Sequence, residues 1–330
     1  MAILTNTKTT YGLGSTAGAR EDLEDTIWDL YPDDTYCLTN LDRTKVSNTY
    51  HEWMSDSLAA AASNAQIEGD DLQSSGFSSY TNPTRLGNYT QIFRKAFVVS
   101  GTGEAVNYAG RKSEIARQAM KQMRELKNDI EYAIVRNQAS SAGGASTARN
   151  FGSMESWIAS TDNSGNGLRA TTTASASTAA YSSGVTAPTD GTTTGALTET
   201  KFKEMLSLAW ADGGDASVVL AGTTQKGVIG GFTGVADKYN EIKGAKQATI
   251  IGAVDMYVSD VGNHAIILHR HVRSSVVLGI DPSMWAVGFL RSPQMKTLAQ
   301  TGDGEKRMII AEATLICRNP NASAKVAACA

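Results

Sequence analysis

The feature that most constrains the fold is one long run of helical periodicity. Residues 111–138 contain no glycine or proline, and apolar residues recur at every third or fourth position. They are Ile115, Ala119, Met123, Leu126, Ile130, Ala133 and Ile134. This spacing predicts an α-helix about 40 Å long with one face packed on a core. Pairs of opposite charge four residues apart, Lys121/Glu125 and Lys127/Glu131, are expected on its solvent side.

Two segments before this helix alternate polar and apolar residues in the manner of β-strands. They are residues 43–54 and 85–100. The stretch between them, residues 56–84, is polar and has too few large apolar side chains to form a core. Two strands that flank such a stretch predict an extended hairpin with a broad tip. We therefore expect the tip to project and to rest on another surface.

The N-terminal region predicts an arm. Residues 1–19 are polar and punctuated by glycines, whereas 20–30 predict a short helix that ends before Pro32. A helix of about three turns does not persist alone in water. Its apolar face should therefore be buried on another surface, either of its own domain or of a neighbouring subunit. Burying its three apolar side chains would contribute roughly 5 to 8 kcal/mol before ordering costs.

The opposite face of this predicted helix is acidic. Glu21, Asp22 and Asp25 lie on it, and basic groups at the hairpin base and the start of the long helix are candidate partners. Exposed ion pairs contribute only about 0 to 1 kcal/mol each, so they should set register and add little affinity.

The second half of the chain has a different character. Of the 37 residues in 161–197, 29 are Ser, Thr, Gly, Ala or Asn, which predicts a solvent-facing insertion or a flexible linker. Beyond it the pattern is mixed. Helices are predicted at 199–210 and 223–231, and strands at 217–221, 248–258, 265–269, 275–278 and 307–318. The whole chain therefore predicts an α+β fold.

Composition excludes several classes of protein. With 30 basic and 33 acidic residues the net charge is -3, which argues against a protein that grips nucleic acid through its phosphates. The start has no signal-peptide pattern, and no apolar window approaches a membrane span. Cys37, Cys317 and Cys329 are scattered and odd in number, which fits a reducing cytosol better than a disulfide framework.

No catalytic, cofactor or metal site is predicted. The glycines of residues 12–18 miss the spacing of a phosphate-binding loop by one position. His269 and His271 could share a strand face near His264. The basic Arg270 and Arg273 flank them, and only Asp260 stands nearby as a further ligand, so a structural role is favoured over a metal site.

His51 stands beside Glu52, but no Ser or Cys sits in a nucleophile motif. We therefore interpret His51 as an exposed strand residue. Trp53, on the same predicted strand, is a residue type favoured as an interface anchor.

Several short segments occur in a distinctive order. They are Arg20–Leu23, Pro32–Thr35, His51–Trp53, Asn64–Gly69, Asn88–Ile92 and Glu125–Glu131. Together they resemble the tailed-bacteriophage major capsid proteins typified by that of the podovirus SU-ten, which have the Hong Kong 97 capsid fold. The likeness covers residues 20–160 well and the remainder only by the order of elements. The insertion at 161–197 departs from the family pattern.

The resemblance implies a division of the chain. Its parts would be an N-terminal arm (1–42), an E-loop hairpin (43–97), a P-domain (98–160) with the spine helix 111–138, an A-domain (161–285) that includes the insertion 161–197, and P-domain return strands (286–330). Arm and hairpin would reach neighbouring subunits. The residues expected at subunit contacts are Glu21, Asp22, Leu23, Asp25, Ile27, Leu30, His51, Glu52, Trp53, Arg94, Lys95, Arg111 and Lys112.

The resemblance also implies a function. The subunit would be made in the cytoplasm of a host bacterium and would self-assemble into hexamers and pentamers of an icosahedral head shell in the virion. Its partners would be further copies, a portal protein, optionally a decoration protein, and packaged dsDNA in weak contact, without a membrane. Because Met1 is retained, a separate scaffolding protein is expected.

Three alternatives stay open from the sequence. The same fold could form an encapsulin-like compartment, which would need a groove that binds cargo. A soluble α/β enzyme could use residues 199–285, which would need a convergent polar pocket. A decoration or fibre protein would fit the Ser/Thr-rich stretch but not the long amphipathic helix.

Overall fold

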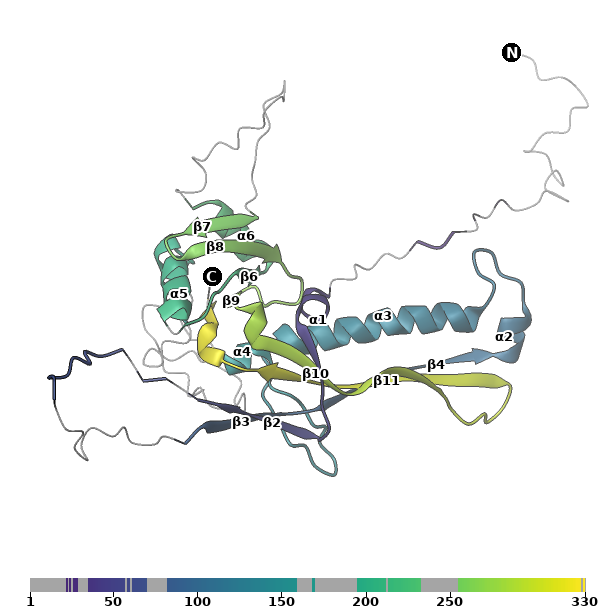
Figure 1. Ribbon diagram of the computed structural model, residues 1–330. Helices are drawn as coiled ribbons and strands as arrows, with labels where there is room; N and C mark the ends of the chain where they lie inside the picture. The colour runs from purple at the N-terminus through teal and green to yellow at the C-terminus, as the bar shows by residue number, and fades with distance from the viewer. Residues whose placement is uncertain are drawn as a thin grey trace, which may run out of the picture.

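The structure is a computed structural model, shown in Figure 1. It describes residues 22, 24, 26–28, 35–56, 58–59, 61–69, 82–158, 168–169, 195–211, 213–232, 255–327 and 329. Helices and strands are mixed along the chain, which confirms the α+β prediction. Among the described helices, none is both long and apolar enough to cross a membrane.

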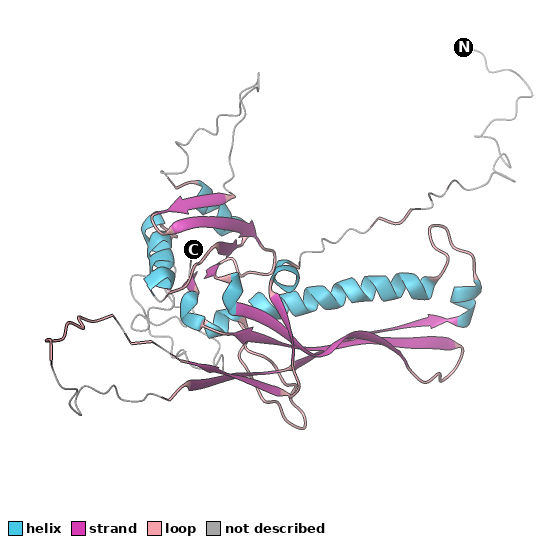
Figure 2. Ribbon diagram, in the orientation of Figure 1, coloured by secondary structure: helices cyan, strands magenta, loops and turns pink. Residues whose placement is uncertain are grey.

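The longer part of the molecule is a four-stranded sheet with a long helix on one face (Figures 1 and 2). The strand order is β1 (Asp42–Lys45), β10 (Trp285–Thr297), β11 (Gly304–Cys317), β4 (Gln91–Ser100). The helix is α3 (Glu114–Val135), and the short α2 (Gly101–Ala105) and α4 (Met154–Trp157) lie near its two ends.

Helix α3 confirms the strongest prediction from the sequence. It starts after Ser113, whose hydroxyl accepts a hydrogen bond from the amide of Ala116 at 3.2 Å. Its 22 residues span about 33 Å, less than expected because both ends of the predicted run are irregular. The predicted apolar face is buried or half-buried against the sheet.

Of the two predicted charge pairs on α3, one is present and one is wrong. Lys121 and Glu125 lie 3.9 Å apart at the surface. Glu131, however, is fully buried and cannot pair with the exposed Lys127. The side chain of Glu131 is enclosed because other parts of the chain pack against that face of the helix.

Strand β11 forms the centre of the core beneath α3. The side chains that alternate along it and face the helix are Ile309, Ala311, Ala313, Leu315 and Cys317, as predicted from their spacing. The neighbouring β10 was not predicted from the residue pattern and was expected only through the resemblance, which placed return strands within 286–330. Its register with β11 shifts between Arg291 and Gln294, around Pro293, which has no amide hydrogen to donate.

A six-stranded sheet forms the rest of the body, at one end of α3 (Figure 1). Its order is β5 (Leu168–Arg169), β12 (Ala324–Ala327), β9 (Val277–Ile280), β6 (Val218–Ala221), β8 (Gly262–Leu268), β7 (Met256–Ser259). Helix α5 (Glu199–Ala211) packs on it through the predicted face of Phe202, Met205, Leu206 and Ala209. Helix α6 (Thr223–Gly230) follows β6, also as predicted.

The predicted hairpin is present as a separate two-stranded sheet. Strand β2 (Tyr50–Ser55) pairs antiparallel with β3 (Thr84–Tyr89), with Tyr50 opposite Tyr89 and Ser55 opposite Thr84. The expectation of one strand over 43–54 is wrong, because residues 42–45 form β1 and pair in parallel with β10. The chain turns after Val46, which is buried against Ala286 and Ile316.

The N-terminal helix expected at 20–30 is not seen. The described residues there, 22, 24 and 26–28, have no helical structure, and the others lie outside the described residues. The physical reason is the one given above: so short a helix is unstable without a surface to pack on. The first described helix is instead α1 (Tyr36–Asn40). Residues 1–19, and most of 161–197, also lie outside the described part.

Candidate functional site

The root of the hairpin is held by a buried amide. Asn88 is fully buried on β3, and its Nδ2 donates to the carbonyls of Leu315 (2.7 Å) and Gly152 (3.1 Å). Its Oδ1 accepts from the amide of Gly152 at 2.8 Å. One side chain therefore connects the hairpin to the central strand β11 and to the segment before α4.

A buried carboxylate holds the chain where β3 passes into β4. Thr90 donates its hydroxyl hydrogen to Glu312 at 2.7 Å, and Arg291 lies 2.8 Å from the same carboxylate. Arg149 also pairs with Glu312 and donates to the carbonyl of Thr90 at 2.7 Å. Burial acts to raise the pKa of Glu312, but the hydrogen bonds and the two arginines together lower it. The residue thus stays ionised and fixes the base from which the hairpin leaves the body.

The predicted contact residues on β2 lie together on the hairpin. Trp53 is half-buried, with its ring 5.5 Å from that of the buried Trp157 and 5.9 Å from that of His51. Burial lowers the pKa of His51. Glu52 is exposed and pairs with Arg85 on the opposite strand. Part of Trp53 is therefore covered by its own chain, and a subunit contact at this residue stays a prediction.

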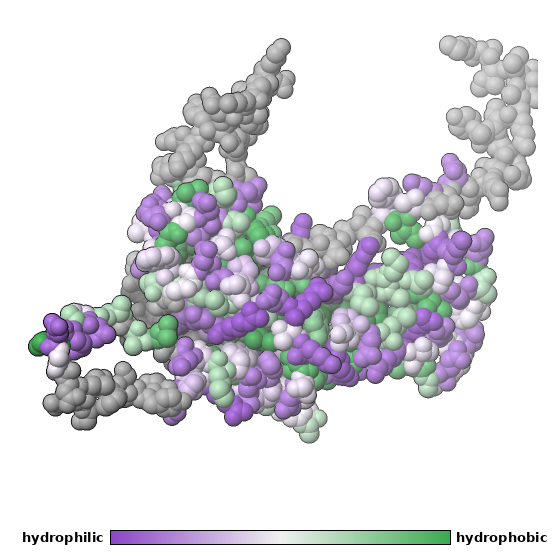
Figure 3. Space-filling model, viewed as in Figure 1, coloured by the Kyte–Doolittle hydropathy of each residue, from purple (hydrophilic) through white to green (hydrophobic). Residues whose placement is uncertain are grey.

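Beyond the strands, the hairpin continues away from the body. Met54, near the end of β2, is 75% exposed, and Leu58, in the segment that follows the strand, is 99% exposed. Figure 3 shows this projecting segment, at the left, with hydrophobic residues among hydrophilic ones and standing clear of the body. Removing apolar side chains from water is favourable, so a second surface that covers them would stabilise the hairpin.

Some of the predicted arm residues are described by the structure, and the others are not. Asp22 and Ile27 are exposed, and the adjacent Trp28 is 73% exposed. The other predicted arm residues, Glu21, Leu23, Asp25 and Leu30, lie outside the described residues.

Two of the four basic residues expected to receive the acidic arm are already engaged within the chain. Lys95 lies 2.7 Å from Asp129 on α3. Arg111 pairs with Glu114, and its guanidinium lies 4.2 Å above the ring of Tyr108. Arg94 and Lys112 are exposed.

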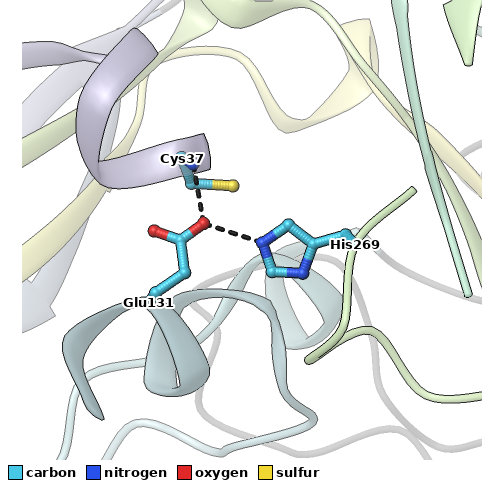
Figure 4. Close-up of side chains that lie close together, drawn as sticks. All are labelled: Cys37, Glu131 and His269. Carbon is cyan, nitrogen blue, oxygen red and sulfur yellow. Dashed lines mark hydrogen bonds and ion pairs between the residues drawn. The ribbon is translucent and has the colours of Figure 1, made fainter. Parts of the chain in front are cut away.

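The most enclosed group of chemically versatile side chains is one that the sequence did not reveal. Cys37, Glu131 and His269 come together from α1, α3 and the loop after β8, all fully buried (Figure 4). The statement that no Cys or Glu stands near His269 is therefore wrong. The available signal was the spacing of Glu131, three and four residues from the apolar Ile134 and Val135, which places it on the buried stripe.

The hydrogen bonds of this cluster define its chemistry. Glu131 accepts from the amides of Cys37 (2.6 Å) and Leu38 (2.8 Å), and its Oε1 also lies 2.8 Å from His269 Nε2. The amide of His271 donates to His269 Nδ1 at 3.2 Å. Nδ1 is thus an acceptor, so the ring proton is assigned to Nε2, which donates to Glu131.

Thiol, carboxylate and imidazole are also the donor types that bind zinc, and their atoms lie within 4.8 Å of one another. A metal ion on Nε2 would need the proton on Nδ1, where the His271 amide already donates. A metal ion bound to Glu131 would also displace N–H groups that now donate to its carboxylate. The arrangement therefore fits a structural contact better than a metal site.

Comparisons with known proteins identify the family of this chain and its fold. The model of the family described as SU10 major capsid protein matches residues 3–330. The "Major capsid protein" of Escherichia phage Phieco32 is 25% identical over 321 residues, which cover 89% of this chain and 90% of the relative.

Solved structures show the same fold at low sequence identity. A chain from Gordonia phage Cozz has a TM-score of 0.58 at 13% identity, covering 100% of this chain and 99% of that one. A chain from the capsid of an empty GTA particle has a TM-score of 0.59 at 8% identity, covering 98% and 99%. The Hong Kong 97-like fold expected from the resemblance is thereby confirmed. With a family model matched over nearly its whole length, this chain belongs to the SU10 major capsid protein family.

Proposed function

We propose that this chain is a non-enzymatic subunit that assembles into hexamers and pentamers, and that these form the icosahedral head shell around phage dsDNA. The observation that carries the proposal is the projecting hairpin. Its root is fixed by Asn88 and Glu312, whereas its far part exposes Leu58 and Met54 to solvent. A rigidly rooted element that leaves apolar side chains uncovered is suited to pack on a second copy.

The N-terminal arm is proposed to act in the same way. Ile27 and Trp28 are exposed apolar residues within an acidic segment. On a neighbouring copy, their burial would supply affinity, and Arg94 and Lys112 offer exposed positive charge for the acidic side chains. The interface residues and the division into arm, E-loop, P-domain and A-domain given above are part of this proposal.

The proposed partners follow from the same function. They are further copies of the chain, a portal protein and a separate scaffolding protein, with weak contact to packaged dsDNA. A decoration protein is a further candidate, because a neighbour of similar fold from phage G was solved as major capsid proteins with decoration proteins (TM-score 0.51, 11% identity). The place of the mature protein would be the virion, after synthesis in the host bacterial cytoplasm.

The test is the native assembly state. Material released from virions should contain this chain in megadalton particles by light scattering, and electron microscopy should resolve hexamers and pentamers. A stable monomer or dimer as the sole native form would overturn the proposal.

A hairpin variant sharpens this test. Leu58→Asp should leave the subunit folded, because the side chain has almost no contact with its own chain, but should abolish shells. Leu58→Met is the matched control and should assemble normally, since it keeps an apolar side chain of similar size. Normal shells from Leu58→Asp would remove the hairpin from the interface.

A further inference from the structure

We propose that Glu131 is a positioning residue for assembly: its buried carboxylate caps α1 and so fixes the point from which the N-terminal arm leaves the body. His269 holds the carboxylate in place. The consequence for shells rests on the function proposed above, whereas the cap itself can be measured in the unassembled subunit.

Helix α1 needs hydrogen-bond acceptors from outside the helix to cap its N-terminus. A five-residue helix leaves its first amides without partners inside the helix, and so short a helix does not persist alone. The residue that precedes it, Thr35, makes no side-chain hydrogen bond to these amides. Glu131 supplies the acceptors instead, one oxygen for Cys37 and one for Leu38. Each of these contacts bridges more than ninety residues of sequence, so the cap is a tertiary contact.

A histidine orients the carboxylate of Glu131. His269 approaches the same carboxylate from the loop after β8, and its other ring nitrogen is occupied by the amide of His271. The ring of His271 in turn lies edge-on to Tyr132, the neighbour of Glu131 on α3. One carboxylate therefore connects helix α1, helix α3 and the loop after β8 (Figure 4).

Placing a charged carboxylate in the core at residue 131 has an energetic cost. A fully buried carboxylate is unfavourable unless its oxygens are satisfied, and here three N–H donors satisfy them. An apolar residue at this position would fill the core without that demand. What it could not supply is the directional link to two backbone amides of α1. The link fixes α1, the helix that follows the N-terminal arm in the chain, against α3 and the loop after β8.

The experiment measures amide hydrogen exchange at Cys37 and Leu38 in the full-length unassembled subunit. Glu131→Gln should raise their exchange about tenfold or more, because one acceptor oxygen becomes an NH₂ group that faces N–H donors. The exchange rates of amides in β6 and β11 should rise much less. The matched control is Glu125→Gln on the exposed side of the same helix, which should leave all of these amides unchanged.

Two variants of His269 test its hydrogen bond to Glu131 independently. They keep the proposal testable if a Glu131 variant fails to fold. His269→Gln retains an N–H donor near the position of Nε2 and should keep the slow exchange of Cys37 and Leu38. His269→Leu should lose it. In assembly reactions, Glu131→Gln and His269→Leu should give fewer closed shells than wild type, and His269→Gln should not.

Several results would overturn the inference. One is an unchanged exchange rate at Cys37 and Leu38 in Glu131→Gln. Another is an equal rise in the exchange rates of β6 and β11, which would reveal only global destabilisation. The last is the same exchange rate at Cys37 and Leu38 in His269→Gln and His269→Leu. If the wild-type chain forms no shells at all, the proposed function fails, but the exchange data still decide whether Glu131 caps α1.

Discussion

Replacing Asn88 by alanine tests whether the hairpin is rooted by side-chain hydrogen bonds. The change removes three bonds, two donated to the carbonyls of Leu315 and Gly152 and one accepted from the amide of Gly152. A typical intramolecular hydrogen bond contributes about 1 kcal/mol, which gives roughly 3 kcal/mol for the set. Leaving the buried amide of Gly152 without a partner adds about 1 kcal/mol, for a total near 4 kcal/mol.

Urea unfolding of the unassembled full-length subunit, followed by tryptophan fluorescence, measures this loss. The midpoint should fall while the dependence on urea concentration stays the same. The matched control is Asn48→Ala, an exposed asparagine at the foot of the opposite strand whose Oδ1 accepts only from the adjacent Thr49. It should cost less than about 1 kcal/mol. A loss below about 1 kcal/mol for Asn88→Ala would refute the claim that this residue anchors the hairpin.

Three further variants test other parts of the proposal. Trp53→Ala should leave a folded subunit but cost about 2 kcal/mol or more per contact in the shell, measured as reduced thermal stability of assembled particles. Deleting residues 1–31 should leave a folded core, checked by circular dichroism, that gives a low yield of particles. Hydrogen bonding from Arg117 lowers the pKa of Glu114 from 4.5 to about 2, so its stabilising contribution is complete above pH 4.5 and is lost as the pH falls toward 2. Glu114→Gln should therefore flatten the fall in urea midpoint over that range.

Each of these has an outcome that contradicts it. Shells of Trp53→Ala with unchanged thermal stability would place that residue outside the contacts between subunits. A chain without residues 1–31 that assembles as well as the full chain would remove the arm from assembly. An identical pH profile for Glu114→Gln would show that the start of α3 does not depend on this ionised carboxylate.

For the acidic arm, neutralising Glu21, Asp22 and Asp25 should make assembly less sensitive to salt but should not abolish assembly.

Local periodicity was enough to predict the elements whose burial follows a simple repeat. The apolar faces of α3 and α5, the alternating residues of β11 and the pairing of the hairpin strands could all be inferred from spacing. In the two helices one face meets a continuous core, so the period of the sequence and the period of burial coincide.

Spacing failed where a polar residue enters the core or where the chain changes direction. Asn88 looks like a surface residue in the sequence, and the spacing of Glu131 places a charged side chain on the buried stripe of α3 without naming its partners; both are fully buried with several hydrogen bonds. The split between β1 and β2 depends on Val46 packing against β10 and β11, and the register of β10 with β11 shifts around Pro293. None of these contacts and strand boundaries can be inferred from the residues adjacent in the sequence.

The sequence by itself thus determined the class of fold, the long helix, the projecting hairpin and, through an ordered set of short segments, the capsid family. Only the tertiary structure decided which polar groups hold these parts together. Cys37 and Glu131 are 94 residues apart, and Glu131 and His269 are 138 apart. A hydrogen bond between such residues leaves no periodic trace in the sequence, because its partners are brought together only when distant elements pack on one another.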